Sequence, residues 1–185
     1  LVTSMPGILP GMSEIEAVRG ELPRQHADVL VNAANSSLLG GGGVDGALHA
    51  AAGPALLAAC HRLRAEQLPD GLPVGQAVVT EAGLLPARWV IHTVGPNRNT
   101  GETDPHLLAA CYTNSLDLAV RLGAASIAFP AIGAGVYGWD PQTAAMVAVR
   151  AVAAHPATGL ERISFVLFSE RLEAAFRAEL EAIGR

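Results

Sequence analysis

One short stretch of this 185-residue chain combines the residue types that could bind and act on an anion. Residues 31–49 read VNAANSSLLGGGGVDGALH: two asparagines, four consecutive glycines, an aspartate and a histidine. A glycine backbone between a strand and a helix can bring several N–H groups close to one anion, because no Cβ keeps the anion away. We therefore interpret this stretch as a phosphate-binding loop.

A second glycine-rich stretch lies at residues 132–138, again between a predicted strand and a predicted helix. Both stretches fit the spacing G-x-G-x-x-G, which is typical of dinucleotide-binding loops in this context. Two such loops are expected at the carboxyl edge of one sheet, where they could hold a single diphosphate from two sides. The alternative is that the glycines only permit tight turns. The glycines in question are Gly41, Gly43 and Gly46 in the first loop and Gly133, Gly135 and Gly138 in the second.

A standard Rossmann dehydrogenase fits these loops poorly. The acidic residue about 20 positions after the first loop is Glu66, which falls inside a predicted helix and not at the end of a second strand. Too few residues follow Gly138 for a complete fold of two nucleotide-binding halves.

Four polar side chains of the first stretch are candidates for chemistry. We expect Asn32 to pin the loop through hydrogen bonds to its backbone, and Asn35, beside the glycines, to contact a ligand. Asp45 and His49 are four residues apart at a predicted helix start and share a face. Asp45 could be a helix N-cap, although Leu48 leaves the capping box incomplete. Because a carboxylate beside a phosphate is repelled by it, we favour a catalytic use for Asp45; His49 could support it or only pack.

The elements that must position these residues alternate between strand and helix. We predict strands at residues 15–18, 27–31, 76–80, 89–94, 126–130 and 163–168, the last without alternation and therefore covered on both faces. Helices are predicted at residues 45–52, 54–67, 107–122, 141–154 and 170–183, and residues 95–105 are predicted to form a flexible loop. This order indicates an α/β sheet with helices on both sides.

The composition and the net charge exclude several classes of binding partner. Half of the residues are hydrophobic, the net charge is -5, and no apolar stretch is long enough to span a membrane, so we expect no binding to nucleic acid duplexes or membranes. Cys60 and Cys111 fall in predicted helices and have no partner at metal-ligand spacing, so we expect neither a disulfide nor a zinc site, and reduced thiols in the cytoplasm. We also expect that the proposed chemistry needs no metal and no cofactor. Residues 1–12 resemble no signal peptide and are interpreted as an N-terminal extension of a single domain over residues 13–185.

Three motifs together resemble the macro domain family, in particular its MacroD-type branch. They are the stretch at residues 31–49, VIHTVGP at residues 90–96 and AFPAIGAGVYGWD at residues 128–140, and the resemblance extends from about Ile15 to the C-terminus. It implies a three-layer α/β/α sandwich with a mixed, roughly six-stranded sheet that binds ADP-ribose. MacroD-type proteins remove single ADP-ribose units ester-linked to acidic side chains of proteins and deacetylate O-acetyl-ADP-ribose.

The resemblance therefore implies a hydrolase whose partners are ADP-ribose and mono-ADP-ribosylated proteins. We expect a monomer, because nothing in the sequence pattern demands a partner chain, and a bacterial origin, because the composition is rich in Ala, Gly, Leu and Arg. Two alternatives stay open: a module that binds ADP-ribose without turnover, and a phosphatase acting on ADP-ribose 1″-phosphate. The pair of Asn35 and Asp45 favours the enzyme, because modules that only bind commonly lack it.

The same resemblance assigns roles to individual residues. Asn35 holds the distal ribose, Asp45 positions or polarises the attacking water, and His49 supports them. Where the family usually has Gly-Asp-Ile, this chain has Gly20-Glu21-Leu22, so Glu21 would accept from the adenine amino group with a side chain one methylene longer. Phe168 is a candidate to pack on adenine, or else a core residue. The diphosphate loops are Gly41, Gly42, Gly43 and Val44, and Gly133, Ala134, Gly135, Val136 and Tyr137, with Tyr137 also packing on the distal ribose.

Overall fold

Six strands form one mixed sheet in the computed structural model, which describes residues 11–185. The predicted extension at residues 1–12 lies almost entirely outside the described residues. Each strand overlaps a predicted one, and their order across the sheet is β1-β6-β5-β2-β4-β3. The strands are β1 (Glu14–Arg19), β2 (Val29–Ala34), β3 (Ala77–Glu81), β4 (Trp89–Val94), β5 (Ser126–Phe129) and β6 (Arg162–Leu167).

Five of the six strands run parallel, and only β3 pairs antiparallel, with β4. Parallel strands place their carboxyl ends at one edge of the sheet, where ligands of open α/β sheets bind. Both glycine-rich stretches follow such ends, because one follows β2 and the other follows β5.

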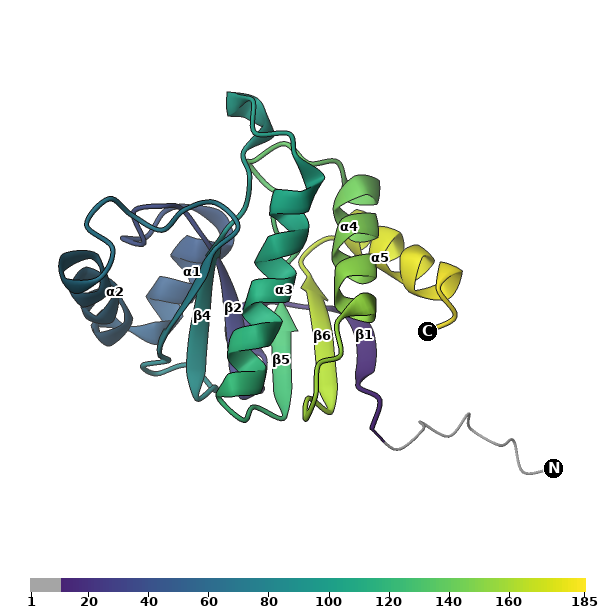
Figure 1. Ribbon diagram of the computed structural model, residues 1–185, viewed down its shortest axis with the longest axis horizontal. Helices are drawn as coiled ribbons and strands as arrows, with labels where there is room; N and C mark the ends of the chain where they lie inside the picture. The colour runs from purple at the N-terminus through teal and green to yellow at the C-terminus, as the bar shows by residue number, and fades with distance from the viewer. Residues whose placement is uncertain (1–10) are drawn as a thin grey trace.

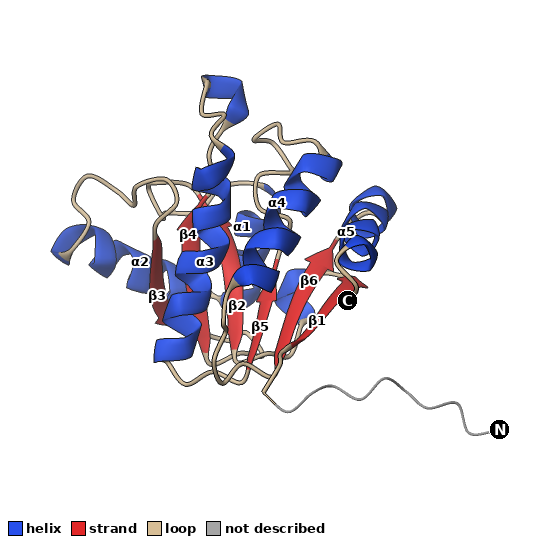
Figure 2. Ribbon diagram, turned by 45° about the vertical axis from the view of Figure 1, so that its right-hand side comes forward, coloured by secondary structure: helices blue, strands red, loops and turns tan. Residues whose placement is uncertain are grey.

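Five helices cover the two faces of the sheet, which confirms the predicted α/β/α sandwich (Figure 1; Figure 2). On one face Val29 and Val31 of β2 pack in a large core with α3, α4 and α5, and on the other Leu30 packs with α1 and α2. This alternation along one strand is what a sheet buried on both sides requires. The helices are α1 (Gly43–Ala52), α2 (Pro54–Glu66), α3 (Pro105–Arg121), α4 (Pro141–Ala154) and α5 (Glu170–Ala182).

The segment between β4 and α3, predicted to be a flexible loop, contains the short 3-10 helix η2 (Arg98–Thr100) and is held at both ends. The backbone N–H of Asn97 donates to the Glu102 carboxylate at 2.7 Å, and the Asn97 side chain accepts from Asn99 N at 3.0 Å. The indole Nε1 of Trp139, after β5, donates to the Pro96 carbonyl at 2.8 Å. The segment is therefore fastened to the second glycine-rich loop.

No helix within residues 11–185 combines the length and the apolar character needed to cross a membrane. Both cysteines are buried free thiols, and burial raises the pKa of each to about 11.

Candidate active site

A cavity of about 460 Å³ opens at the carboxyl edge of the sheet, between the two glycine-rich loops. It brings together most of the residues that the sequence singled out, from segments more than 100 residues apart. Its walls contain no arginine, and Asp45 is the one charged residue among them. They are formed by Ala33, Ala34, Asn35, Gly41, Gly42, Gly43, Val44, Asp45, Gly95, Pro130, Ala131, Ile132, Gly133, Gly135, Val136, Tyr137 and Phe168.

Asn35 shapes the first loop and also lines the cavity. Its side-chain oxygen accepts from the backbone N–H of Ser37 at 3.1 Å, and its amide nitrogen donates to the Gly40 carbonyl at 3.1 Å. Asn35 therefore holds the loop through hydrogen bonds to its backbone, which is the role that we predicted for Asn32. Asn35 thus combines a loop contact with a position at the cavity wall.

Helix α1 begins directly from this loop, with Gly42 as its N-cap residue. The interpretation of Asp45 as the N-cap is therefore wrong, because Asp45 lies in the first turn of the helix. Gly46 allows this arrangement, since a Cβ built there would lie only 2.5 Å from the carbonyl oxygen of Gly41. The N–H groups of the first turn lie beside the cavity, and a helix N-terminus favours an anion there.

The second loop is braced by its neighbours. Gly133 has a φ of +81°, and a Cβ there would meet the indole ring of Trp139 at 2.7 Å. The Asn99 side chain donates to the Val136 carbonyl at 2.6 Å, and Arg98 N donates to the Tyr137 carbonyl at 2.9 Å. Burial, together with the charges of Glu102 and Asp45, raises the pKa of Tyr137, which keeps this phenol neutral.

Ala134, which was assigned to the second diphosphate loop, does not line the cavity and packs against the hydrophobic core instead.

Asp45 is the buried carboxylate of the site, with 5% of its surface exposed. Its Oδ1 accepts from the amide nitrogen of Asn32 at 2.8 Å. The prediction that Asn32 pins the loop is wrong, because β2 continues to Ala34 and buries Asn32 completely inside the sheet. The Asn32 side chain consequently reaches the carboxylate of α1 and makes no hydrogen bond to the loop backbone.

His49 lies one turn after Asp45 on α1, with its Nε2 at 3.4 Å from Asp45 Oδ1. Among the described residues, neither ring nitrogen of His49 has a hydrogen-bond partner. The contact is therefore an approach of two polar groups and not a hydrogen bond.

His92 of β4 is a site residue that the sequence analysis did not identify. It is completely buried beside Asn32, and its Nδ1 lies 3.1 Å from the Asn32 amide nitrogen. Burial, and secondarily the charge of His49, lowers its pKa to about 3. The available signal was its position in VIHTVGP, where a titratable side chain lies inside a predicted strand.

The outer end of the cavity is bordered by Phe168, whose side chain is 59% exposed. This exposure rules out the alternative of a core phenylalanine. Glu21 and Leu22 are not brought to the cavity wall: the Glu21 carboxylate pairs with Arg24 Nε at 2.9 Å, and Leu22 is buried in the same cluster as Leu48.

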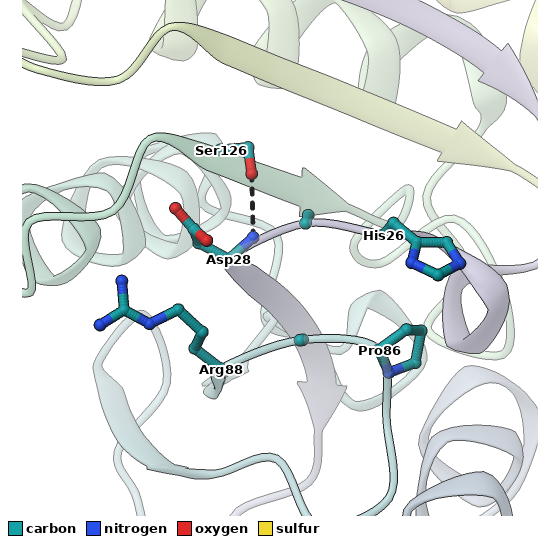
Figure 3. A pocket seen from close by; sticks show the side chains of 7 residues that line it. His26, Asp28, Pro86, Arg88 and Ser126 are labelled. Atoms are coloured by element: carbon teal, nitrogen blue, oxygen red, sulfur yellow. Dashed lines mark hydrogen bonds between the residues drawn. The ribbon is translucent and has the colours of Figure 1, made fainter.

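A shallower hollow of about 410 Å³ lies at the opposite edge of the sheet, between the amino ends of strands (Figure 3). There Asp28 N donates to the Ser126 hydroxyl at 2.9 Å, and the Asp28 carboxylate accepts from Ala125 N at 2.7 Å. His26 and Arg88 stand at its rim (Figure 3). These contacts tie strand ends together, and no predicted site residue lies among them.

No group of three or more His, Cys, Asp or Glu side chains placed to hold a metal ion occurs in residues 11–185.

Fold and site together define an α/β protein that carries two glycine-rich loops around one buried carboxylate at the carboxyl edge of its sheet. The family model described as "Macro domain" matches residues 31–148, and the chain belongs to the macro domain family. That match includes Asn35, Asp45, His92 and both loops.

Relatives support the assignment over nearly the whole chain. A macro domain-containing protein of Streptomyces coelicolor is 56% identical over 169 residues, which is 91% of this chain and 99% of the relative. An O-acetyl-ADP-ribose deacetylase of Klebsiella pneumoniae is 52% identical over 165 residues, covering 88% and 93% of the two chains. Among solved structures, a variant of the Oceanobacillus iheyensis macrodomain with ADPR superposes with a TM-score of 0.89 at 39% identity and covers 97% of both chains.

Proposed function

We propose that this protein is a hydrolase that removes mono-ADP-ribose from acidic side chains of modified proteins and also deacetylates O-acetyl-ADP-ribose. The observation that carries the proposal is the buried Asp45 carboxylate, held by Asn32 at the wall of a cavity between two neutral glycine-rich loops. The deacetylase of Klebsiella pneumoniae and the macrodomain solved with ADPR support the choice of ligand. In both proposed substrates a carboxylate is esterified to the distal ribose.

Binding of the diphosphate is assigned to backbone donors. The chain contains no lysine, and the cavity wall contains no arginine. Residues 41–44, which include the start of α1, and residues 133–137 would face the phosphate oxygens from two sides, with N–H groups and a helix N-terminus supplying the positive potential. Phe168 then lies at the adenine end of the ligand.

The distal ribose is assigned to the inner end, between Asn35, Asp45 and Tyr137. The Asn35 amide has a second hydrogen beyond the one given to Gly40, and this hydrogen is available to a ribose hydroxyl. His49 does not line the cavity, and it is assigned a supporting role because its Nε2 lies 3.4 Å from Asp45 Oδ1.

The proposed chemistry requires placement more than strong acid or base. When the bond from C1″ to a carboxylate leaving group breaks, the ribose carbon acquires oxocarbenium character, and the carboxylate leaves without protonation. Asp45 orients the attacking water, accepts its proton and stabilises the positive charge at C1″. The product is free ADP-ribose and an unmodified acidic side chain.

The decisive experiment compares wild type, Asp45→Ala and Asp45→Asn on a protein mono-ADP-ribosylated on glutamate. Removal of a general base lowers kcat by about 100- to 10,000-fold. We expect ADP-ribose binding, measured by calorimetry, to be unchanged or tighter, because the substitution also removes a negative charge close to the diphosphate. Asp45→Asn preserves the shape and so separates the loss of charge from the loss of packing.

Other outcomes point elsewhere. Wild type that binds ADP-ribose but releases none from the protein indicates a binding module. Release of inorganic phosphate from ADP-ribose 1″-phosphate, without activity on the protein, indicates the phosphatase. Full turnover by Asp45→Ala refutes the role of Asp45.

A further inference from the structure

We propose that His92 is a positioning residue for Asp45, acting through Asn32 from inside the sheet. The inference deepens the proposed function and rests on it, because Asp45 is the carboxylate assigned to hydrolysis.

A line of polar side chains crosses three adjacent strands beneath the cavity. Asn32 of β2 and His92 of β4 are directly paired in the parallel ladder, and Thr80 belongs to β3 on the far side of β4. All three side chains are buried, with exposed fractions of 0%, 0% and 7%. They form a chain of short contacts that ends at Asp45 of α1.

The hydrogens along this line are assigned from the donors and acceptors that each side chain offers. The amide nitrogen of Asn32 carries two hydrogens, and its two neighbours are Asp45 Oδ1 at 2.8 Å and His92 Nδ1 at 3.1 Å. A carboxylate can only accept, so one hydrogen goes to Asp45, and the other requires an unprotonated Nδ1 on His92. The proton of the neutral ring then sits on Nε2 and is donated to the Thr80 hydroxyl at 2.9 Å.

The surroundings of His92 agree with the neutral ring. Its other near neighbours are the Cys60 thiol, with Sγ 3.8 Å from Nε2, and the His49 ring, with centroids 6.5 Å apart. Burial raises the pKa of the Cys60 thiol to about 11, so this neighbour is uncharged, and burial lowers the pKa of His92 itself to about 3. His92 is thus neutral throughout the physiological range, as the hydrogen-bond assignment requires.

This arrangement decides which way the carboxylate of Asp45 points. Asn32 anchors Oδ1, and Oδ2 is the oxygen on the side of Gly41, where a Cβ built on that glycine would lie 3.2 Å from it. Gly41 lines the cavity, so Oδ2 is the oxygen offered to water and ligand. If His92 Nδ1 carried a proton, that proton would face an amide hydrogen of Asn32. The Asn32 amide would then rotate, and its hydrogen bond to Asp45 Oδ1 would be lost.

The test compares His92→Phe, which keeps a ring of similar size without an acceptor, with His92→Asn, whose side-chain oxygen replaces Nδ1 as acceptor. We expect His92→Phe to lower kcat by about 10- to 100-fold, as for a catalytic group displaced by about 1 Å. The KM and the dissociation constant for ADP-ribose should stay within about twofold, and His92→Asn should recover most of the loss in kcat. Thr93→Val is the matched control, because this neighbour on β4 is equally buried and its hydroxyl donates to the Gln76 carbonyl outside the network.

A second measurement is independent of turnover and of folding of the variants. In wild type, ¹⁵N NMR of the His92 ring should show an unprotonated Nδ1 and a protonated Nε2, unchanged between pH 5 and pH 8. A protonated Nδ1, or titration within that range, overturns the inference.

The two proposals fail in different ways. Normal turnover by wild type together with an undiminished kcat of His92→Phe refutes the role of His92 alone. Absence of turnover by wild type refutes the proposed function, and with it the positioning role of His92.

Discussion

Phe168 is the aromatic side chain that the site leaves open to solvent. It follows β6 directly, borders the cavity and is 59% exposed, although most large apolar side chains of the chain are buried. An exposed ring at a cavity mouth offers a flat apolar surface on which a base can stack. Little folding stability depends on this side chain, so its contribution to binding can be measured separately.

Phe168→Ala should weaken ADP-ribose binding by about 1–3 kcal/mol, which is about 5- to 150-fold, because stacking of one base on an aromatic ring contributes that much. The melting temperature should hardly change. Calorimetry measures the affinity, and Phe168→Tyr serves as the control because it retains the ring. Equal affinity of Phe168→Ala and wild type would show that adenine lies elsewhere.

Residues beside the glycines could be predicted from the sequence, and residues inside the sheet could not. Asn35 and Asp45 follow a strand end or a helix start, where a polar side chain has few structural explanations, and both line the cavity. Asn32 was misinterpreted because β2 ends three residues later than predicted, which converts a loop residue into a strand residue. His92 was missed because its partner across the ladder is 60 positions away, and that pairing depends on the strand order.

At the scale of elements, the start of α1 determines the shape of the first loop. The helix begins at Gly43, and the chain before it folds back against its first turns. The carbonyl of Gly41 therefore contacts the backbone of Gly46. This contact leaves no room for any side chain at position 46. It keeps the N–H groups of the helix start close to the cavity.

Gly46→Ala should therefore shift the loop away from the helix. We expect a loss of about 1–3 kcal/mol in the free energy of unfolding, typical of overpacking, together with weaker ADP-ribose binding. Gly135→Ala is the matched control for stability, since a Cβ there meets nothing within 4 Å and the φ of Gly135 lies outside the left-handed region. Denaturant unfolding gives the comparison. A Gly46→Ala protein as stable as Gly135→Ala would contradict the packing explanation.

The five α-helices and six strands of residues 11–185 overlap predicted ones, and the errors concern their ends, the loops and the short 3-10 helix η2. The segment between β4 and α3 is rich in Asn, Gly and Thr, a composition that predicts a loop but does not reveal its contacts. Its hydrogen bonds go to Trp139 and Val136, about 40 positions later in the chain. Such contacts have no local sequence signal, because they depend on how β4 and β5 are arranged in the sheet.

At the scale of the whole molecule, the core buries several titratable groups in their neutral forms. Burial lowers the pKa of His92 to about 3 and raises that of Cys60 and Cys111 to about 11. Burial also raises the pKa of Tyr112, which is completely buried among Phe129 and Phe165. Each group is protonated differently in the folded and unfolded chain over some range of pH, so each adds a slope to the dependence of stability on pH.

The stability of the folded state should consequently pass through a maximum near pH 7 to 9. Below pH 6.5, His92 is protonated in the unfolded chain but stays neutral in the folded chain. The unfolded state then binds more protons than the folded state, so the stability of the folded state falls as the pH falls. From pH 7 to pH 5 this costs about 2 kcal/mol, at about 1.4 kcal/mol per pH unit below 6.5. Above about pH 9 the unfolded thiols ionise while the folded ones keep their protons up to about pH 11, and stability falls again.

Of the shifted pKa values in the described residues, that of His92 is the one that bears on the range from pH 5 to pH 7. Asp104 and Asp140 have lowered pKa values, so their stabilising contributions persist above the ordinary carboxyl pKa and are lost only at lower pH, outside the range from pH 5 to pH 7. His92→Phe, which cannot be protonated, should therefore lose about 2 kcal/mol less than wild type between pH 7 and pH 5, whatever its absolute stability. Thermal or denaturant unfolding at the two pH values measures this difference. Parallel losses in the two proteins would mean that His92 is protonated in the folded state, and the hydrogen bond from Asn32 to its Nδ1 could not exist at pH 5.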